Sequence, residues 1–406
     1  MEHLPRAEAR PLLERAALYS MGVYLFVLNL PRVASLREAS FLISAALAAA
    51  YMWKMGRVAW PPMRLLLLMW LAFAFLSVIP GSDLPFSISE VKKDVVYPLM
   101  AFWVFYVMTK GERDFLSLSI PFLISAALVS LASFYAYFVL GLGFEELVDS
   151  GYLYGKRAYY SFFMLSAAIV AIGLAGCGSA GRRLKTLAIA LVPVFCTGVY
   201  FARLRVGYLA IIMAAFLFFI YGKVLRQGLK RRILAGAVAA SILVTLPLLA
   251  TYRDLDFGLD IESMKTSFER IRTEERWIIW EGAVKEISSN PVFGRGFGNK
   301  EIYVPDFRLG YVYPHNILLS YGVMTGVAGI VLLMLIFGKL CWMMHAKVGQ
   351  CASNSAQFSI ILAGLVLTSV FFLLNMTEDI MTRHTGQLFW ALTGMFLGAG
   401  REVDDR

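Results

Sequence analysis

Long apolar segments alternate with short polar connections along almost the whole chain of 406 residues. Many of these segments approach the roughly 20 residues that a helix needs to cross a bilayer. Their continuous apolar character favours helices over barrel strands, in which apolar and polar side chains would alternate. The pattern predicts an all-α bundle of twelve transmembrane helices, at residues 16–31, 39–56, 63–80, 95–109, 116–140, 158–177, 184–202, 206–222, 232–251, 316–340, 356–376 and 385–400.

One long polar interval, residues 252–314, interrupts this pattern. It divides the chain into nine predicted spans over residues 1–251, a loop, and three predicted spans over residues 315–406. Within the loop, Trp277, Trp280, Val284 and Ile287 recur at helical spacing. They predict an amphipathic helix over residues 261–289, and Pro291 would end it. Aqueous chemistry is therefore expected in or beside this loop.

The composition, 59% hydrophobic and 16% charged, excludes a soluble fold of two or three domains. A net charge of +10 would suit a nucleic-acid-binding protein, but the basic residues are spread over many short connections and form no basic domain. Their distribution is better explained by the preference of Lys and Arg in short loops for the cytoplasmic side of a membrane. We assign successive connections between spans alternately to the two sides of the membrane and leave the long loop out. The side that holds both termini then has 20 Lys and Arg residues, and the opposite side has 9. Both termini should therefore be cytoplasmic, and the long loop should be periplasmic.

The chain ends and the cysteines indicate no processing and no disulfide framework. The first apolar run is not followed by a small-residue cleavage site, so we expect a retained membrane anchor. The four cysteines have no framework spacing and are expected to be free thiols.

Several basic side chains fall at the predicted periplasmic ends of spans. Arg203 and Arg205 separate the seventh and eighth spans, and Lys156 and Arg157 precede the sixth. Arg276 lies in the predicted loop helix, beside its apolar face. An arginine at a membrane boundary is costly to desolvate unless it has a partner or water, which makes it a candidate functional residue. The alternative is that these side chains only snorkel to the interface.

His315 follows Pro314 at the start of the tenth predicted span, on the periplasmic side. Imidazole is the side chain whose ordinary pKa, about 6.5, best suits proton transfer near neutrality. His315 is therefore the candidate general base. The alternative is a polar residue that only marks the start of a helix. The remaining histidines are His3, His345 and His384.

The glycine-rich segment Phe293–Asn299 has two possible interpretations. Its alternate glycines allow the backbone to approach a ligand such as phosphate, or they allow tight turns in a compact connection between helices. No metal site is indicated. Asp254 and Asp256 have a suitable spacing, but no second acidic cluster supports them, and no other cofactor is expected.

Taken in order, these motifs resemble the O-antigen ligase and polymerase superfamily from about Arg157 to the end of the chain. The resemblance rests on an arginine and tryptophan, an Asn-Pro pair, alternate glycines, and His-Asn at a helix start followed by glycines. In this sequence the motif residues are Arg276, Trp280, Asn290-Pro291, Gly294, Gly296, Gly298, His315-Asn316, Gly322 and Gly326. Two positions depart from the family pattern. Leu204 replaces a serine before Arg205, and no Pro-Asn follows Arg157.

The resemblance implies a periplasmic glycosyltransferase of GT-C-like architecture in the bacterial inner membrane. Such an enzyme moves O-antigen from undecaprenyl pyrophosphate to a lipid A core sugar hydroxyl in lipopolysaccharide biosynthesis, with inversion and without metal. Arg205 and Arg276, with Arg157 in support, would stabilise the departing pyrophosphate. Arg203 and Lys156 are further candidates for binding it. His315 would deprotonate the acceptor hydroxyl.

Three other functions remain open. An O-antigen polymerase or a protein O-oligosaccharyltransferase would share the donor and differ in the acceptor. A lipid-linked glycan transporter or flippase would belong to a different class. That class predicts internal repeats and polar residues in mid-membrane, whereas the charges here gather at one predicted rim.

Overall fold

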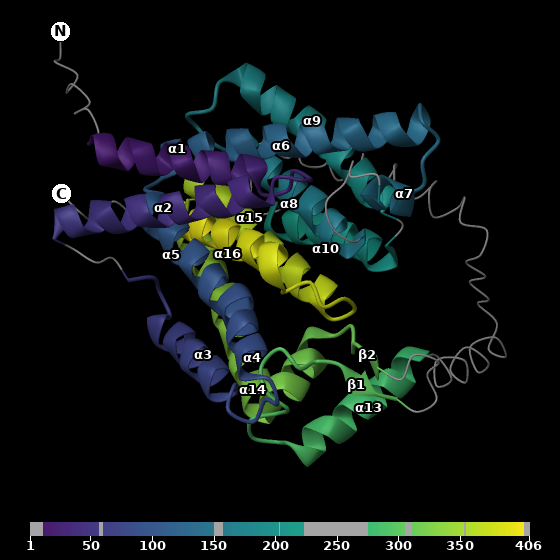
Figure 1. The fold of residues 1–406 in the computed structure, drawn as a ribbon. Helices are drawn as coiled ribbons and strands as arrows, with labels where there is room; N and C mark the ends of the chain where they lie inside the picture. Colours follow the sequence, from purple (N-terminus) through teal and green to yellow (C-terminus); the bar gives the residue numbers. More distant parts are fainter. Residues whose placement is uncertain are drawn as a thin grey trace, which may run out of the picture.

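The computed structural model describes residues 11–56, 60–149, 157–202, 204–222, 275–304, 311–352 and 355–401. These residues are almost entirely helical, with one two-stranded antiparallel sheet (Figure 1). The α-helices are α1 (Leu12–Val27), α2 (Ala34–Met55), α3 (Arg64–Leu76), α4 (Leu84–Val91), α5 (Tyr97–Met108), α6 (Glu112–Phe138), α7 (Phe144–Asp149), α8 (Arg157–Ala175), α9 (Arg182–Phe201), α10 (Arg205–Gly222), α13 (Glu275–Ser289), α14 (Ile317–Gln350), α15 (Ala356–Asn375) and α16 (Arg383–Ala399). A π-helical turn, η1 (Lys92–Val96), joins α4 to α5, and the strands are β1 (Ile302–Tyr303) and β2 (Tyr311–Val312).

Eleven of the twelve predicted spans coincide with helices, and the remaining one, residues 232–251, lies outside the described residues. Five described helices, α6, α8, α9, α14 and α15, are long and apolar enough to cross a membrane. Two shorter apolar helices, α3 and α10, accompany them. The prediction of an all-α, multi-pass membrane protein is therefore confirmed in its coarse form. The number of crossings and the GT-C-like architecture stay predictions.

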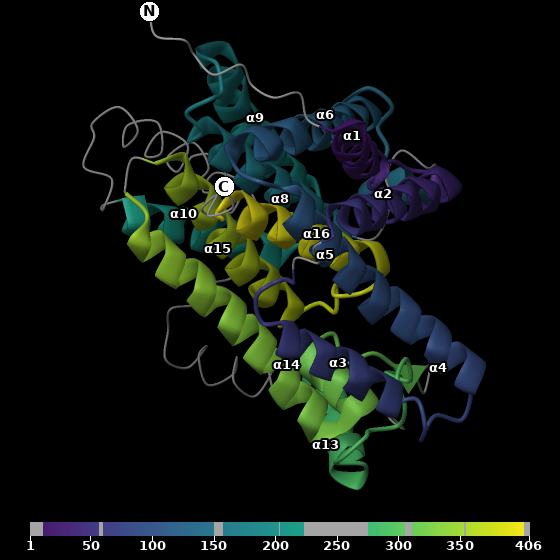
Figure 2. The ribbon, with the colours of Figure 1, turned by 90° about the vertical axis from the view of Figure 1, so that its left-hand side faces the viewer.

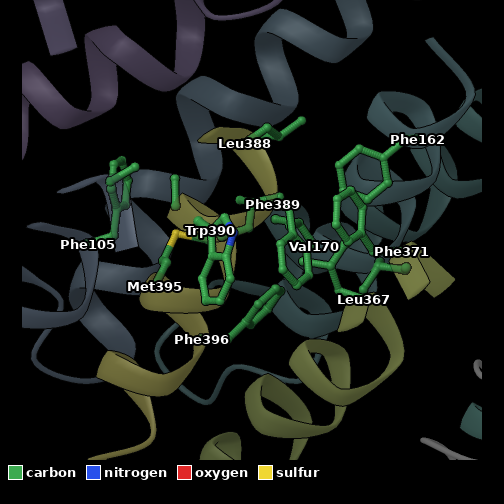
Figure 3. Close-up of a cluster of buried hydrophobic side chains, with 14 of the residues drawn as sticks. Phe105, Phe162, Val170, Leu367, Phe371, Leu388, Phe389, Trp390, Met395 and Phe396 are labelled. Carbon is green, nitrogen blue, oxygen red and sulfur yellow. The ribbon is translucent and has the colours of Figure 1, made fainter. Parts of the chain in front are cut away.

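Aromatic residues from α5, α8, α15 and α16 fill the centre of the helical bundle (Figure 3). Phe371 and Phe389 stack with their ring centroids 3.9 Å apart, and Trp390 is fully buried. Gly394 lies directly against the backbone oxygen of Phe102, so α16 and α5 pack closely along their length. Hydrophobic transfer gives little drive for association between helices already in lipid, so close packing of this kind is what holds them together.

The predicted span at residues 95–109 begins earlier in the structure than the apolar pattern indicated. Asp83 starts α4 by accepting a hydrogen bond from the Phe86 backbone N–H at 2.9 Å. The helix then continues through η1, which contains Lys92, Lys93 and Asp94. These charges end the apolar window but not the helix. The π-helical turn keeps the backbone hydrogen-bonded there, and such turns are frequent at functional sites.

The predicted loop helix is present as α13, which begins at Glu275, and residues 261–274 lie outside the described residues. The Ile287 side chain packs where Gly322 leaves room on the first turns of α14. Figure 2 shows α3, α13 and α14 together at one end of the molecule. The described part of the long loop is therefore ordered against the helical bundle.

The segment Phe293–Asn299 occupies a break in α14. Gly326 interrupts that helix with φ 72° and ψ −171°. The Val327 backbone N–H donates to the Pro291 oxygen, and the Arg295 N–H donates to the Val323 oxygen, both at 2.8 Å. A side chain at Gly294 would collide with the backbone of Met324 and Thr325. Here the glycines permit close packing of protein backbone, which supports the interpretation of this segment as a compact connection.

Candidate active site

A cavity of about 850 Å³ opens where this glycine segment meets the connection between α15 and α16, η1 and the start of α8. The residues that line it are Phe86, Glu90, Asp94, Arg157, Ala158, Tyr159, Leu204, Arg295, Gly298, Asn299, Lys300, Glu301, Tyr313, His315, Glu378, Asp379, Ile380, Thr382, Arg383 and Thr385. Its volume lies in the range of pockets that enclose whole small-molecule ligands, about 300–1,000 Å³. Charged side chains of both signs make up much of its wall.

Asn316 fixes one side of this cavity. Its side-chain oxygen accepts hydrogen bonds from the Leu318 and Leu319 backbone N–H groups at 3.0 and 3.2 Å, which caps α14. Its side-chain nitrogen donates to the Met376 oxygen at 2.9 Å. One residue therefore starts α14 and also holds the α15–α16 connection beside it.

Asn375 shapes the same connection from within. Its side-chain oxygen accepts a hydrogen bond from the Ile380 backbone N–H at 3.1 Å, and its nitrogen donates to the Phe371 oxygen at 2.8 Å. The tight turn between these residues places Glu378 and Asp379 on the cavity wall.

Glu378 lies between His315 and Arg276. Its Oε2 is 3.6 Å from His315 Nδ1, longer than a hydrogen bond, and its Oε1 is 3.4 Å from Arg276 Nη2. Arg276 also donates to the Thr377 oxygen at 3.4 Å. His315 has a backbone φ of 50° and a half-exposed side chain. A non-glycine residue in the left-handed region is uncommon, and such residues cluster at functional sites.

Trp280 joins α13 to the same point. Its indole N–H donates to the Pro314 oxygen at 2.9 Å, directly before His315. The loop helix and the start of α14 are thereby tied together around the histidine.

A second charged group surrounds Lys300. The Lys300 ammonium is 2.8 Å from Asp379 Oδ2, and both side chains are largely buried. Burial by itself lowers the pKa of Lys300, but the Asp379 and Asp94 carboxylates outweigh that effect and raise the pKa above its ordinary value. Lys300 therefore remains a cation in the cavity wall at neutral pH.

Tyr313 forms the rim beside Lys300. Its hydroxyl donates to Glu301 at 2.5 Å, and this hydrogen bond, together with burial and the Glu301 charge, raises the pKa of Tyr313. The Lys300 ammonium lies 5.7 Å from the centre of the Tyr313 ring. The tyrosine is thus held as a neutral hydrogen-bond donor with one ring face beside a cation.

The described residues contain no group of three or more His, Cys, Asp or Glu side chains placed to hold a metal ion. The cavity wall contains arginine and lysine side chains, one histidine and carboxylates.

A family model described as O-antigen ligase matches residues 189–334. Over these residues the chain is similar to the O-antigen ligase family. The match runs from α9 through α13 and the glycine segment to the first half of α14, and so includes Arg205, Arg276 and His315. A search among curated proteins found no match. The family assignment made from the sequence is confirmed, and a function of O-antigen ligase or polymerase type follows in general terms.

The site residues predicted from the sequence lie at different places relative to the cavity. Arg157, the first residue of α8, and His315 both line it. Arg276 reaches its edge through Glu378 but is not a lining residue. Arg205 is exposed at the start of α10, where the preceding residue, Leu204, lines the cavity. Lys156 and Arg203 lie outside the described residues.

The sequence did not indicate several charged residues of the cavity wall. They are Glu90, Asp94, Arg295, Lys300, Glu301, Glu378, Asp379 and Arg383. Lys300 and Asp379 are 79 residues apart in the chain, so no local spacing relates them. The only available signal was that charges beside apolar segments collect on the predicted periplasmic side.

Proposed function

We propose that this protein transfers O-antigen from undecaprenyl pyrophosphate to a hydroxyl group of a lipid A core sugar, in the cavity described above and on the periplasmic side of the inner membrane. The observation that carries this proposal is the cavity itself. His315 and Arg157 line it together with Lys300, Arg295 and Arg383. Of these, His315, Lys300 and Arg295 lie in the segment that is similar to the O-antigen ligase family.

The cations suit the leaving group. As the bond between the anomeric carbon and the diphosphate oxygen breaks, its electron pair moves to the diphosphate, where negative charge grows. Arginine side chains stabilise such charge by charge-assisted, often bidentate hydrogen bonds. We assign this role to Arg157 in the cavity wall, with Arg276 and Arg205 at its edge and Arg203 and Lys156 in support. This arrangement requires no metal ion.

His315 suits the acceptor. The acceptor hydroxyl oxygen attacks the anomeric carbon from the side opposite the diphosphate, and its proton passes to the imidazole of His315. Attack from that side inverts the configuration. Glu378 Oε2, 3.6 Å from Nδ1, is placed to accept a hydrogen bond from a proton on that nitrogen after a small movement. Nε2 would then be left as the base, as a carboxylate sets the histidine tautomer in other enzymes.

The test is reconstitution with defined substrates. Purified protein in liposomes receives synthetic undecaprenyl pyrophosphate carrying an O-antigen unit, together with lipid A core, in EDTA and without ATP. Mass spectrometry of the lipid fraction should show the glycan joined to lipid A core, and liposomes without protein serve as control. Growth of the lipid-linked glycan alone would show a polymerase. Movement of the donor across the bilayer with no covalent product would show a transporter and would overturn the proposal.

A further inference from the structure

A second, smaller cavity of about 170 Å³ lies next to the first, beside the first turns of α2, η1 and the starts of α5 and α16. The residues lining it are Arg37, Glu38, Phe41, Leu42, Lys93, Tyr97, Arg383, His384 and Gln387. Arg383 lines both cavities. The second cavity is smaller than pockets that enclose a whole ligand, about 300–1,000 Å³, so it fits one group of a larger molecule.

The charges in this cavity are unequal. Three cations, Arg37, Lys93 and Arg383, line it with one carboxylate, Glu38, which is exposed. Two further carboxylates lie beside these cations. Glu90 is 2.8 Å from Lys93 and 3.7 Å from Arg383, and Asp94 accepts a hydrogen bond from the Arg383 backbone N–H. Among the side chains that line the cavity itself, three cations face one carboxylate, which favours an anionic occupant.

Arg37 is the strongest single observation. Its side chain is 1% exposed although it is charged, and it is held through a hydrogen bond from Nη2 to the Leu30 oxygen at 3.0 Å. Burying a guanidinium at a membrane boundary is costly, and such residues are functional candidates. The planar fork of arginine matches a phosphate group in particular.

Arg383 is the second observation. Its backbone φ is 43°, in the left-handed region, and its backbone N–H donates to Asp94 Oδ1 at 2.8 Å. Strained backbone of this kind persists where the surroundings enforce it and clusters at binding sites. The Arg383 side chain is largely exposed and lines both cavities.

The apolar part of the wall comes from Phe41, Leu42 and Tyr97, and the rest from His384 and Gln387. Phe41 and Tyr97 meet edge to face at 5.7 Å, and Leu42 is half exposed beside them. Leu36 and Ile43 continue this exposed apolar face of α2. A ligand with a charged head and an acyl body would fit an opening with cations inside and apolar side chains outside.

We propose that this second cavity binds a phosphate group carried by a lipid, held by Arg37, Lys93 and Arg383. The phosphate could be carried by the acceptor glycolipid or by an anionic phospholipid of the membrane, and the chemistry of recognition is the same for both. The choice of the acceptor glycolipid as the lipid that carries this phosphate rests on the proposed function, whereas the phosphate site itself does not. The shared residue Arg383 then places the bound lipid beside the reaction cavity.

The test uses Lys93→Gln, with Lys92→Gln as the matched control. Lys92 is the neighbouring lysine of η1, is exposed and does not line the cavity. Arg37→Lys is a second variant that keeps the buried charge and removes the planar fork. Binding to detergent-purified protein is measured by native mass spectrometry with four probes. These are phosphorylated lipid A core, the same lipid after dephosphorylation, phosphatidylglycerol and diacylglycerol.

We expect Lys93→Gln to weaken binding of a phosphorylated probe about tenfold, the usual effect of losing one hydrogen bond to a charged group. Binding of the phosphate-free probes should not change. Weaker binding of lipid A core would support the acceptor as source, and weaker binding of phosphatidylglycerol alone would support a membrane phospholipid. Equal affinities of Lys93→Gln and Lys92→Gln for both phosphorylated probes would overturn the site. Because these measurements need no turnover, a failed transfer assay would reject the proposed function and leave this result standing.

Discussion

The aromatic centre of the bundle and the large cavity are built in opposite ways. In the centre, Phe371, Phe389 and Trp390 are held by packing of apolar side chains, and glycines such as Gly394 let the helices approach closely. In the cavity, side chains are held by charge, as in the Lys300–Asp379 pair. This difference teaches where each kind of substitution should act. Changes in the centre should alter stability, and changes to cavity residues that contact substrate should alter transfer while the fold remains.

The largest expected effect is on activity. His315→Ala should lower the transfer rate about 100-fold to 10,000-fold, the usual contribution of a general base, with the thermal unfolding midpoint unchanged. His345→Ala is the control, because His345 is an exposed residue near the far end of α14 and pairs with Tyr221. Steady-state transfer to lipid A core measures both. Full activity in His315→Ala would remove this residue from the mechanism.

Arg157→Gln should have the next largest effect. Loss of one charge-stabilising contact typically lowers kcat by about 100-fold to 1,000-fold. Arg157→Lys should recover only part of the loss, because an ammonium cannot form the bidentate contact. The control is Arg182→Gln, at the exposed start of α9 and outside the cavity. If Arg157→Gln and Arg157→Lys had the same kcat as the parent protein and the control, the pyrophosphate would not lie against Arg157.

Lys300→Gln should lower stability although Lys300 lines the large cavity, so it is a measurable exception to the division between centre and cavity. It leaves the largely buried Asp379 carboxylate without its ion pair, which should lower the free energy of unfolding by about 1–3 kcal/mol. Lys285→Gln breaks an exposed pair with Glu281 and should change it by less than about 0.5 kcal/mol. Denaturant unfolding measures the stability of Lys300→Gln and of Lys285→Gln. The same measurement on the double variant Lys300→Gln/Asp379→Asn gives the coupling energy between Lys300 and Asp379. Additive effects in the double variant would contradict the pairing.

Gly394→Ala tests the centre. The added methyl group would meet the Phe102 oxygen, and overpacking of this kind costs about 1–3 kcal/mol. In Gly338→Ala the added group would meet no described atom within 4 Å, so that helix should be unchanged or slightly more stable. Thermal unfolding in detergent compares the two. Activity per folded molecule should be unchanged in both variants, and a selective loss in Gly394→Ala would contradict the division of roles.

The smallest effect is expected at the rim. Hydrogen bonding to Glu301 raises the pKa of Tyr313, so the phenol stays neutral as pH rises through its ordinary value near 10. Tyr313→Phe should lower activity less than about tenfold, the equivalent of one hydrogen bond. Its pH–rate profile between pH 6 and 9 should keep the parent shape, because Tyr313 does not titrate there. A shifted profile would show that Tyr313 takes part in proton transfer.

Apolar periodicity was enough to find most of the helices. It also placed the start of α14 correctly, because Asn316 is both a sequence signal for a helix start and the cap in the structure. It did not find the early start at Leu84, since Lys92, Lys93 and Asp94 end the apolar window while a π-helical turn carries the helix through them.

The candidate site could be predicted only in part. Family motifs identified His315 and the arginines, but the side chains that face them come from distant segments. Glu378 meets Arg276 across 102 residues of chain, and such a contact has no local signature. The alternate glycines had two possible roles, and only the contacts of Gly294 and Gly326 with backbone favour one of them.

The proposed function requires that the large cavity is the reaction chamber and that it opens outside the bilayer. Thr382→Cys tests it most directly in a background without the four natural cysteines, because Thr382 lines the cavity and is partly exposed. Transfer is measured before and after a membrane-impermeant maleimide is added to intact spheroplasts. We predict labelling from outside, slower labelling when the lipid-linked donor is present, and loss of transfer once labelled. Labelling only from the cytosolic side, or full transfer by the labelled protein, would contradict the account.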